Sequence, residues 1–545
     1  MDIAAETSFC AVLAMRDGYV QELLVAGHPI ALDGTSLFLL RHELETLIEA
    51  GRARRPAKLD LITWHPIDQA IDETAGRLST RRAKARDHWR QLAVAGPHST
   101  VPFSWDWREG DLVLRTSITS ARIAKAAEAG AERHSVTAPT LLQSVLAILI
   151  TGWTGNSSCA IGSVTANRWS KKLSSSIGRF SSGVRVPVTP VDGQLFSEFS
   201  SVVHASLLSA YVHSCHDVGG LVMEEARASA KSGARITNSV SFEYHDYLAG
   251  QELPGLTAIV PGPWESDGDV IHQRALARND VPYIAVDAMP AIGEMRVILK
   301  CASSLMGKEQ ARTFLLEFAH ILEAVAAGDP SIRAVRDGVS LNRVWRESDH
   351  WRSINDAWVN LDDIASLIES HPKVSRAYPF IDSPSDERAR PKVTVYVTPH
   401  EDDLDLVELN DYVRDCVSHF PSTVAPGRYV VCAVEPSAGG SQDAWERQPK
   451  LDAFDADHRF ASFSPATSEP ERLLAEIFAS IHGNHQVDVA KTYSELGGEF
   501  LLIPTMLTSL QNADAVGLAF DDFLGISSLR RLAAKLRLPE RLTQA

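Results

Sequence analysis

The chain has 545 residues, 45% of them hydrophobic, so it can bury more than one core, and its length predicts about three domains. Its formal net charge of −16 argues against a nucleic acid or an anionic membrane surface as partner. No apolar run reaches transmembrane length and the first residues have no basic signal-peptide region, so we expect a cytoplasmic protein.

Residues 1–338 alternate strand-like and helix-like stretches, which predicts a mixed α/β fold with a large core. The apolar run from Leu23 to Ala26 predicts a buried strand that ends at Gly27. Further on, apolar periodicity predicts helices at 41–51, 140–155, 195–213 and 309–328, and strands at 159–168, 283–289 and 294–300.

Residues 339–358 are polar with interspersed tryptophans, and we expect a hinge there. A small α/β unit is predicted at 359–455, although the Gly, Ser, Asp and Pro content of 439–468 also resembles a linker. We place the linker at 456–468 and a helical unit at 469–545. In that unit four apolar residues share one helical face, namely Leu474, Ile477, Phe478 and Ile481.

Few chemical motifs are evident. The six cysteines lie far apart without a Cys-x-x-Cys pair, which favours free thiols over a metal site. The sequence has no glycine-rich nucleotide loop and no common hydrolase motif, so we expect no cofactor. One stretch, "HPIALDG" at 28–34, places a histidine and a carboxylate at the end of a predicted strand.

Several stretches in order resemble the condensation domains of nonribosomal peptide synthetases. "HPIALDG" is similar to their His-His-x-x-x-Asp-Gly active-site motif, and "TGWTGNSSCAIGSVTANR" ends in their Ala-Asn-Arg. "IGRFSSGVRVPV" resembles the following Gly-x-Phe-Val-Asn-Thr segment, and "DHWRQL" at 87–92 resembles a helix that often carries Tyr-Trp or His-Trp. The resemblance implies an α/β (α+β) fold like that of chloramphenicol acetyltransferase, with a partial N-lobe and a full C-lobe.

The resemblance extends beyond residue 338. The stretches at 359–382 and 421–436 are similar to the small C-terminal subdomain of adenylation domains, and "TYSELGGEFLL" at 492–502 looks like the attachment motif of peptidyl carrier proteins. This implies a synthetase module with a small α/β adenylation-type subdomain and a helical carrier bundle. The large adenylation core, which would hold the ATP and amino-acid pockets, is absent.

The residues that carry chemistry in these families are replaced. Pro29 stands at the catalytic histidine position, and proline has neither a titratable group nor an N–H. His28 holds the first, more structural position. The resemblance implies that Asp33 forms an ion pair with an arginine upstream of the motif, but only 27 residues precede His28. We therefore expect Asp33 to need another partner or a solvated site.

The other two units show similar losses. Ser441 or Gln442 stands at the adenylation lysine position, and Lys450 comes too late to match. Phe500 occupies the position of the carrier serine, and Ser494 is a poor substitute for it. The sequence leaves open whether Phe500 docks on a partner or packs inward.

Two functions fit this pattern. The first is a non-catalytic scaffold in a natural-product pathway that binds carrier proteins or other synthetase subunits. The second is a condensation-type acyltransferase that forms an amide or ester from a carrier-bound thioester, because a tunnel that holds two reactants together can accelerate aminolysis by positioning alone. A decayed gene product without a role is a third alternative.

Overall fold

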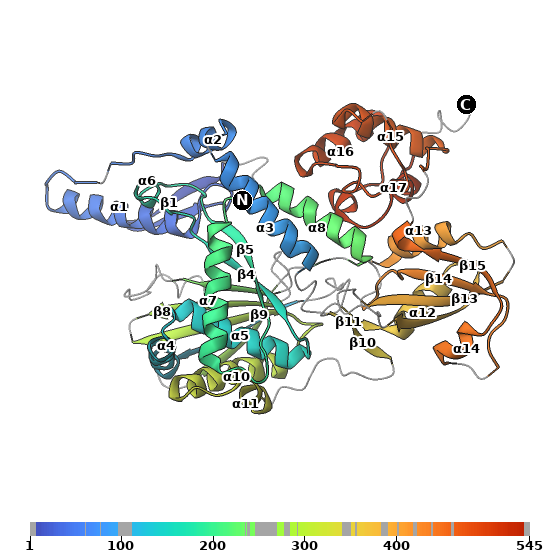
Figure 1. Cartoon of the computed structure of the whole chain (residues 1–545). Coiled ribbons are helices and arrows are strands. Elements are labelled where there is room, and N and C mark those ends of the chain that lie inside the picture. Colours follow the sequence, from blue (N-terminus) through green and yellow to red (C-terminus); the bar gives the residue numbers. More distant parts are fainter. Residues whose placement is uncertain are drawn as a thin grey trace.

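The computed structural model describes residues 7–538 apart from 60, 77, 96–111, 235, 237–239, 246–269, 277–283, 292, 340–349, 355–356, 383–390, 401–402, 418–421, 438–439, 459–462 and 485. The described part contains one seven-stranded sheet, one four-stranded sheet and two two-stranded sheets (Figure 1).

The seven-stranded sheet is mixed, with strand order β5-β4-β6-β8-β9-β3-β7. Strand β6 pairs in parallel with β4 and β8, and the other neighbours are antiparallel. Phe242, Val286 and Val297 point to one face of the sheet and join the largest core. The residues that alternate with them along each strand therefore lie on the opposite face. The strands are β3 (Val113–Ser120), β4 (Cys159–Thr165), β5 (Ser182–Val188), β6 (Val240–Tyr244), β7 (Val270–Leu276), β8 (Ile284–Ala291) and β9 (Glu294–Ala302).

A helical layer packs on the core face of this sheet. Its central helix, α5 (Ala138–Thr154), is buried on nearly all sides, begins at the N-cap Thr137 and ends at Gly155, where φ is +74°. Around it lie α4 (Ala121–His134), α7 (Phe196–Val212), α10 (Lys308–Ala327) and α11 (Ile332–Asp337). The predicted mixed α/β fold with a large core is thus confirmed. Among the described residues no single helix is long and apolar enough to cross a membrane, although α4 and α5, bent by 98°, pass that test as a pair.

The N-terminal elements begin with an exposed hairpin. Strand β1 (Phe9–Arg16) pairs with β2 (Tyr19–Gly27), and Leu24 is 65% exposed. The prediction of a buried strand was therefore wrong: β2 exists, but within the described residues β1 is the only strand that pairs with it. Three helices follow, α1 (Gly34–Arg52), α2 (Pro66–Thr74) and α3 (Ser79–Ala95).

We expected a hinge at 339–358, but the described part of this segment forms a hairpin that packs against both neighbouring cores. Residues 340–349 and 355–356 lie outside the described part. The remainder contributes a hairpin of β10 (Trp351–Ile354) and β11 (Ala357–Asn360). Trp358 is buried and its indole N–H donates to the Thr154 carbonyl at 2.8 Å, while Ile354 packs in a second core. Burial of both side chains ties the two cores together, which a polar hinge would not do.

The second core belongs to a small α/β unit with strand order β12-β13-β14-β15. The reading of 439–468 as a linker was wrong for its first part, because this segment supplies a helix and the edge strand β15, paired antiparallel with β14. The elements are α12 (Leu361–Glu369), β12 (Val374–Asp382), β13 (Lys392–Pro399), α13 (Leu406–Cys416), β14 (Arg428–Cys432), α14 (Gln442–Glu446), β15 (Lys450–Asp455) and the short 3-10 helix η3 (Ala456–His458).

The last unit is helical and has its own core. On α15 (Glu469–His482), Leu474 and Phe478 are buried as the periodicity predicts, with Ile477 and Ile481 partly buried beside them. The other elements are the 3-10 helices η4 (Phe500–Leu502) and η5 (Phe520–Leu524), and the helices α16 (Ile503–Asn512) and α17 (Leu529–Lys535).

One helix touches all three parts of the molecule. Helix α8 (Val218–Ser232) lies beside α3, where Glu224 pairs with Arg90 at 3.2 Å (Figure 1). Met223 of α8 joins the core of the helical unit, and Ala230 joins the core of the small α/β unit. The three parts therefore share a junction at α8.

Candidate functional site

The "HPIALDG" stretch forms a tight turn between β2 and α1. The backbone N–H of Ile30 donates to Nδ1 of His28 at 3.2 Å, and Pro29 is exposed. His28 is half-buried, and its Nδ1 accepts a hydrogen bond within the turn. The structure therefore places His28 where it holds the loop, and it places no titratable group at position 29.

Asp33 starts α1. It is the N-cap residue, and its Oδ1 accepts hydrogen bonds from the Ser36 N–H at 2.9 Å and from the Ser36 hydroxyl at 2.8 Å. This arrangement explains the local sequence, because an aspartate before the first helical residues satisfies N–H groups that have no partner within the helix.

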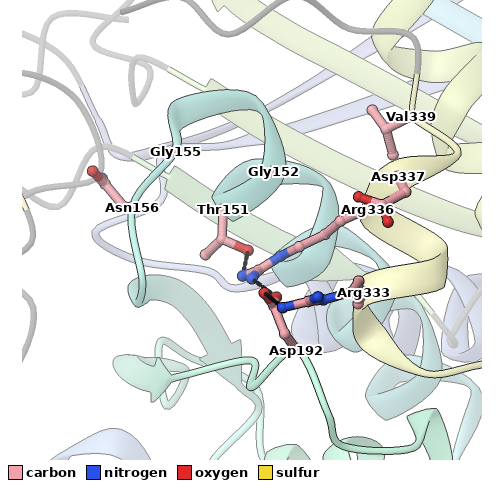
Figure 2. Close-up of a pocket in the computed structure, with 9 residues that line it drawn as sticks. All are labelled: Thr151, Gly152, Gly155, Asn156, Asp192, Arg333, Arg336, Asp337 and Val339. Carbon is pink, nitrogen blue, oxygen red and sulfur yellow. Dashed lines mark hydrogen bonds and ion pairs between the residues drawn. The ribbon is translucent and has the colours of Figure 1, made fainter. Parts of the chain in front are cut away.

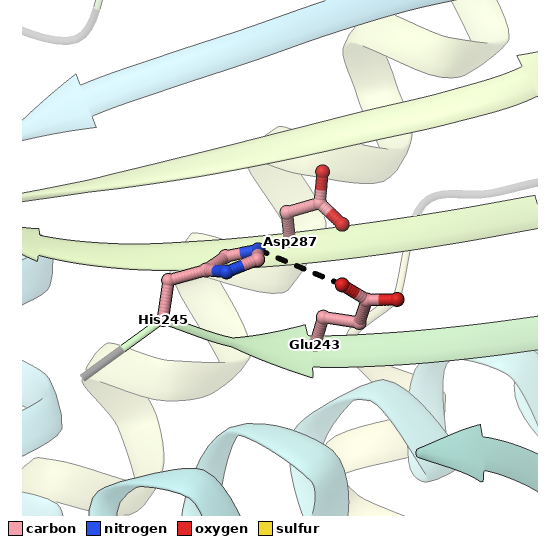
Figure 3. A group of neighbouring side chains, drawn as sticks. All are labelled: Glu243, His245 and Asp287. Carbon is pink, nitrogen blue, oxygen red and sulfur yellow. Dashed lines mark ion pairs between the residues drawn. The ribbon is translucent and has the colours of Figure 1, made fainter. Parts of the chain in front are cut away.

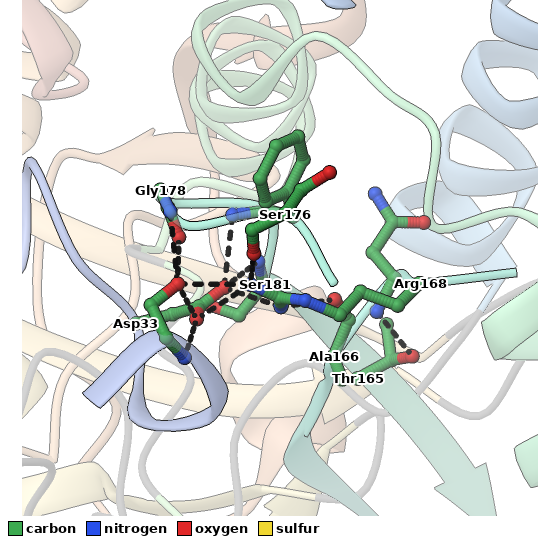
Figure 4. A network of polar contacts seen from close by, with 10 residues as sticks. Asp33, Thr165, Ala166, Arg168, Ser176, Gly178 and Ser181 are labelled. Carbon is green, nitrogen blue, oxygen red and sulfur yellow. Dashed lines mark hydrogen bonds and ion pairs between the residues drawn. The ribbon is translucent and has the colours of Figure 1, made fainter. Parts of the chain in front are cut away.

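The partner of Asp33 is Arg168, from the "TANR" end of the segment after β4 (Figure 4). Nη1 and Nη2 of Arg168 donate to the two carboxylate oxygens at 2.7 and 2.9 Å. Only 3% of the Asp33 side chain and 6% of the Arg168 side chain are exposed. Of the two expectations for Asp33, another partner or a solvated site, the first is confirmed: the partner is a downstream arginine, 135 residues away in sequence, and the site is buried.

The segment after α6 (Lys171–Ser174) completes the network. The backbone N–H groups of Phe180 and Ser181 donate to Oδ2 of Asp33 at 2.9 and 3.0 Å. Burial alone would raise the pKa of the Asp33 carboxyl, but the hydrogen bond from Arg168 and those from backbone N–H groups outweigh it and lower that pKa. Asp33 stays ionised and clamps three segments together, which suits a positioning role and not proton transfer.

The adenylation-like stretch has no lysine at the expected place. Ser441 is the N-cap of α14, and the Gln442 amide donates to Oδ1 of Asp382 at 2.9 Å. Lys450 lies at the start of β15. Both residues at the lysine position are thus engaged in local structure.

The structure answers the question of Phe500. Its ring is half-buried and makes an edge contact with Phe520, with ring centres 5.2 Å apart, and it lies against Gly219 of α8. Phe500 therefore packs inward, against the first turn of α8. Ser494 is buried, and its hydroxyl lies 3.0 Å from that of Thr492, so it is not presented at a surface.

A polar cavity of about 350 Å³ lies at the C-terminal end of α5 (Figure 2). Arg336 donates to Asp192 at 2.7 Å and to the Thr151 hydroxyl at 2.9 Å within it. Arg333 also pairs with Asp192, at 3.5 Å. Because Asp192 and Asp337, which also lines the cavity, together offset the charges of these two guanidinium groups, the cavity gives no reason to expect a particular ligand. Sequence reasoning did not find it, since its residues come from three separate segments.

A second cavity, of about 270 Å³, lies between α3 and α8. Trp89 of α3 and Leu221 of α8 contribute apolar walls, and Arg82, Arg86 and Glu224 contribute charges. It adjoins the first turn of α8, close to where Phe500 packs on Gly219.

Residues 2–332 match the family model described as "Condensation domain". Because this match covers more than half of the chain, the chain belongs to the condensation domain family and has its mixed α/β fold. Condensation domains catalyse amide bond formation and work with carrier proteins and other modules of nonribosomal peptide synthetases.

Individual proteins show the same relationship. The chain is 25% identical over 222 residues to a dimodular nonribosomal peptide synthase of Bacillus subtilis (strain 168), covering 39% of this chain and 9% of that protein. It is 26% identical over 254 residues to phosphinothricin tripeptide synthetase PhsC of Streptomyces viridochromogenes, covering 45% and 23%. The chain thus matches less than a quarter of the length of either relative.

Solved structures are also similar. The first condensation domain of the calcium-dependent antibiotic synthetase, in complex with substrate analogue 3a, aligns with a TM-score of 0.46 at 15% identity, over 60% of this chain and 69% of that one. The X-domain from teicoplanin biosynthesis aligns with a TM-score of 0.45 at 18% identity, over 61% and 75%.

Proposed function

We propose that this chain is a nonribosomal peptide synthetase-like protein of a natural-product pathway, which acts in the cytoplasm as a non-catalytic partner of carrier proteins or other synthetase subunits. The proposal depends mainly on one observation in the "HPIALDG" turn. Hydrogen bonds between Asp33 and Arg168 hold the loop in place, while position 29, where the family motif has its catalytic histidine, is an exposed proline.

His28 does not replace the missing imidazole in this proposal. A general base must reach the proton that it takes, and Nδ1 of His28 is occupied by the Ile30 N–H at 3.2 Å. The remaining contacts of the turn are structural. A loop that keeps its architecture without a base is what a binding domain derived from an enzyme would retain.

The rest of the chain supports the same proposal. We infer that residues 359–455 form an adenylation-type subdomain and 469–545 a carrier-type bundle, on the basis of the motif resemblance described above. Ser441 or Gln442 stands where the former would need a lysine, and Phe500 stands where the latter would need a serine. Neither unit then has its chemical group, but both contribute surfaces.

A second candidate is a condensation-type acyltransferase that forms an amide or ester. The observation in its favour is that the clamp between Asp33 and Arg168 is intact. An enzyme can accelerate aminolysis of a thioester by positioning both reactants, an effect worth up to about 7–11 kcal/mol in well-oriented systems.

Direct binding tests the scaffold proposal. The full chain would be immobilised and exposed to the carrier domains and synthetase subunits encoded near its gene, with binding followed by interferometry. We expect saturable binding of at least one of them, in the apo or the phosphopantetheine-loaded form. A monodisperse, folded chain that binds none of them, in either form, would contradict the proposal.

A further inference from the structure

Three possible metal ligands lie together on the sheet face opposite the main core (Figure 3). They are Glu243 at the end of β6, His245 two residues further on, and Asp287 on β8. Phe242 and Val286 point into the helical core, so alternation places Glu243 and Asp287 on the other face. Each of the three offers a ligand atom, and these atoms all lie within 4.8 Å of one another.

The backbone holds this group in place. Glu243 and Asp287 are direct neighbours in the parallel pairing of β6 with β8. The His245 N–H donates to the Ala288 carbonyl at 2.9 Å, which continues the alignment one step beyond β6. Glu243 and Asp287 lie on paired strands, and a backbone hydrogen bond to β8 holds His245, so the fold positions all three ligand residues.

The spacing suits a shared ion. Nε2 of His245 and Oε2 of Glu243 lie 3.8 Å apart, which is too long for a hydrogen bond. Two ligands held at about 2.1 Å by a tetrahedral metal ion lie about 3.4 Å apart. A small rotation of the side chains would therefore bring the two atoms to the separation that such an ion requires.

We propose that Glu243, His245 and Asp287 bind a divalent transition metal ion, with Zn²⁺ as the best match. One imidazole and two carboxylates with an open fourth position form a donor set that zinc accepts, whereas Ca²⁺ and Mg²⁺ prefer oxygen ligands alone. This site could not be predicted from the sequence, because Asp287 lies more than 40 residues from Glu243 and His245.

Lys300 of β9 is the competitor for this site. Its ammonium group lies 2.5 Å from Oδ2 of Asp287, so it already neutralises part of the local negative charge. Oδ1 of Asp287 remains as the second carboxylate oxygen, and the metal ion would use that atom. Removing the lysine charge should therefore strengthen metal binding, which is the opposite of what an unrelated structural substitution would do.

Metal titration of the purified full chain tests the proposal. After treatment with EDTA, Zn²⁺ binding would be measured by equilibrium dialysis, and Co²⁺ binding by its visible absorption, which reports the ligand geometry. We expect one ion per chain. His245→Ala and the isosteric Glu243→Gln should each weaken binding by more than about tenfold, since even residues that only support metal ligands have effects of 10–100-fold. Lys300→Met should bind more tightly than the wild type.

His350→Ala is the matched control, because His350 also pairs with a carboxylate, that of Asp362 at 2.6 Å, but at an exposed site away from the cluster. It should bind Zn²⁺ as the wild type does. Thermal unfolding establishes that each variant is folded. A wild-type dissociation constant above about 1 mM overturns the site. Equal affinity in the wild type, Glu243→Gln and Lys300→Met overturns it as well.

Discussion

Phe500 of the helical unit lies directly on Gly219 of α8, in the condensation domain. A Cβ atom at position 219 would come within 3.0 Å of the Phe500 Cβ, so only glycine allows this approach without displacement. Nearby, the Arg227 Nε donates to the Ser494 carbonyl at 2.8 Å. Phe500, which the motif resemblance aligns with the carrier serine, is thus part of an internal interface.

Gly219→Leu should loosen this interface, because the new side chain would push Phe500 away from α8. We expect faster hydrogen exchange in η4 and in the first turns of α8, measured by mass spectrometry. Gly51→Leu is the control: Gly51 also lies in a helix, but nothing is within 4 Å of its added Cβ, and exchange at η4 should not change. Unchanged exchange at η4 in Gly219→Leu would mean that the contact is not stabilising.

Incubation with coenzyme A and a promiscuous phosphopantetheinyl transferase should leave the intact mass of the wild type unchanged, because a phenylalanine ring has no hydroxyl to modify. Phe500→Ser supplies the hydroxyl, yet we expect partial modification at best, since the site faces α8 and Glu499 and Pro504 remain beside it. Intact-mass spectrometry measures both. Gain of the arm by the wild type would show that the alignment of "LGGEF" with the carrier motif is wrong.

Asp33→Asn should destabilise the condensation domain by about 3–5 kcal/mol, because it leaves the buried Arg168 charge without its partner. Chemical denaturation followed by fluorescence gives this value. Glu45→Gln, which removes an exposed ion pair with Arg41 at 2.8 Å, should change stability by less than about 1 kcal/mol. Similar effects of the two substitutions would argue against a clamp at Asp33.

The contribution of Asp33 should also depend on pH. Its pKa in the folded protein is lowered from the ordinary 3.8, so the unfolded state takes up the proton first as the pH falls. The stabilisation is complete above that ordinary value and is lost as the pH falls through the folded pKa. The stability difference between wild type and Asp33→Asn should therefore be constant from about pH 5 to 7 and shrink below about pH 4. A difference that grows on acidification would contradict this assignment.

Periodicity predicted the elements whose residues interact locally. Helix α5 could be predicted because its apolar run ends at Gly155, and α15 because Leu474 and Phe478 repeat on one face. Burial of β2 was predicted wrongly, since an apolar run does not show whether another layer covers it. The edge strand β15 was missed because its polar residues resemble those of a linker.

The candidate site, too, was predicted only where the evidence for it lies in local sequence. The motif resemblance identified Asp33 and the segment around Arg168 separately, but their pairing depends on two loops that the fold brings together. The inward packing of Phe500 depends on Gly219, in another part of the chain. Long-range contacts of this kind leave no periodic signal in the sequence, and the cluster of Glu243, His245 and Asp287 was missed for the same reason.

The central claim is that position 29 carries no catalytic base and that His28 does not replace it. The most direct test incubates the full chain with an aminoacyl-loaded carrier protein and a free amine, and compares amide formation by the wild type, His28→Ala and a reaction without the protein. We predict that wild type and His28→Ala form amide at the same rate, equal to the background. A wild-type rate above background that collapses in His28→Ala would contradict the claim and assign the chain to the acyltransferases.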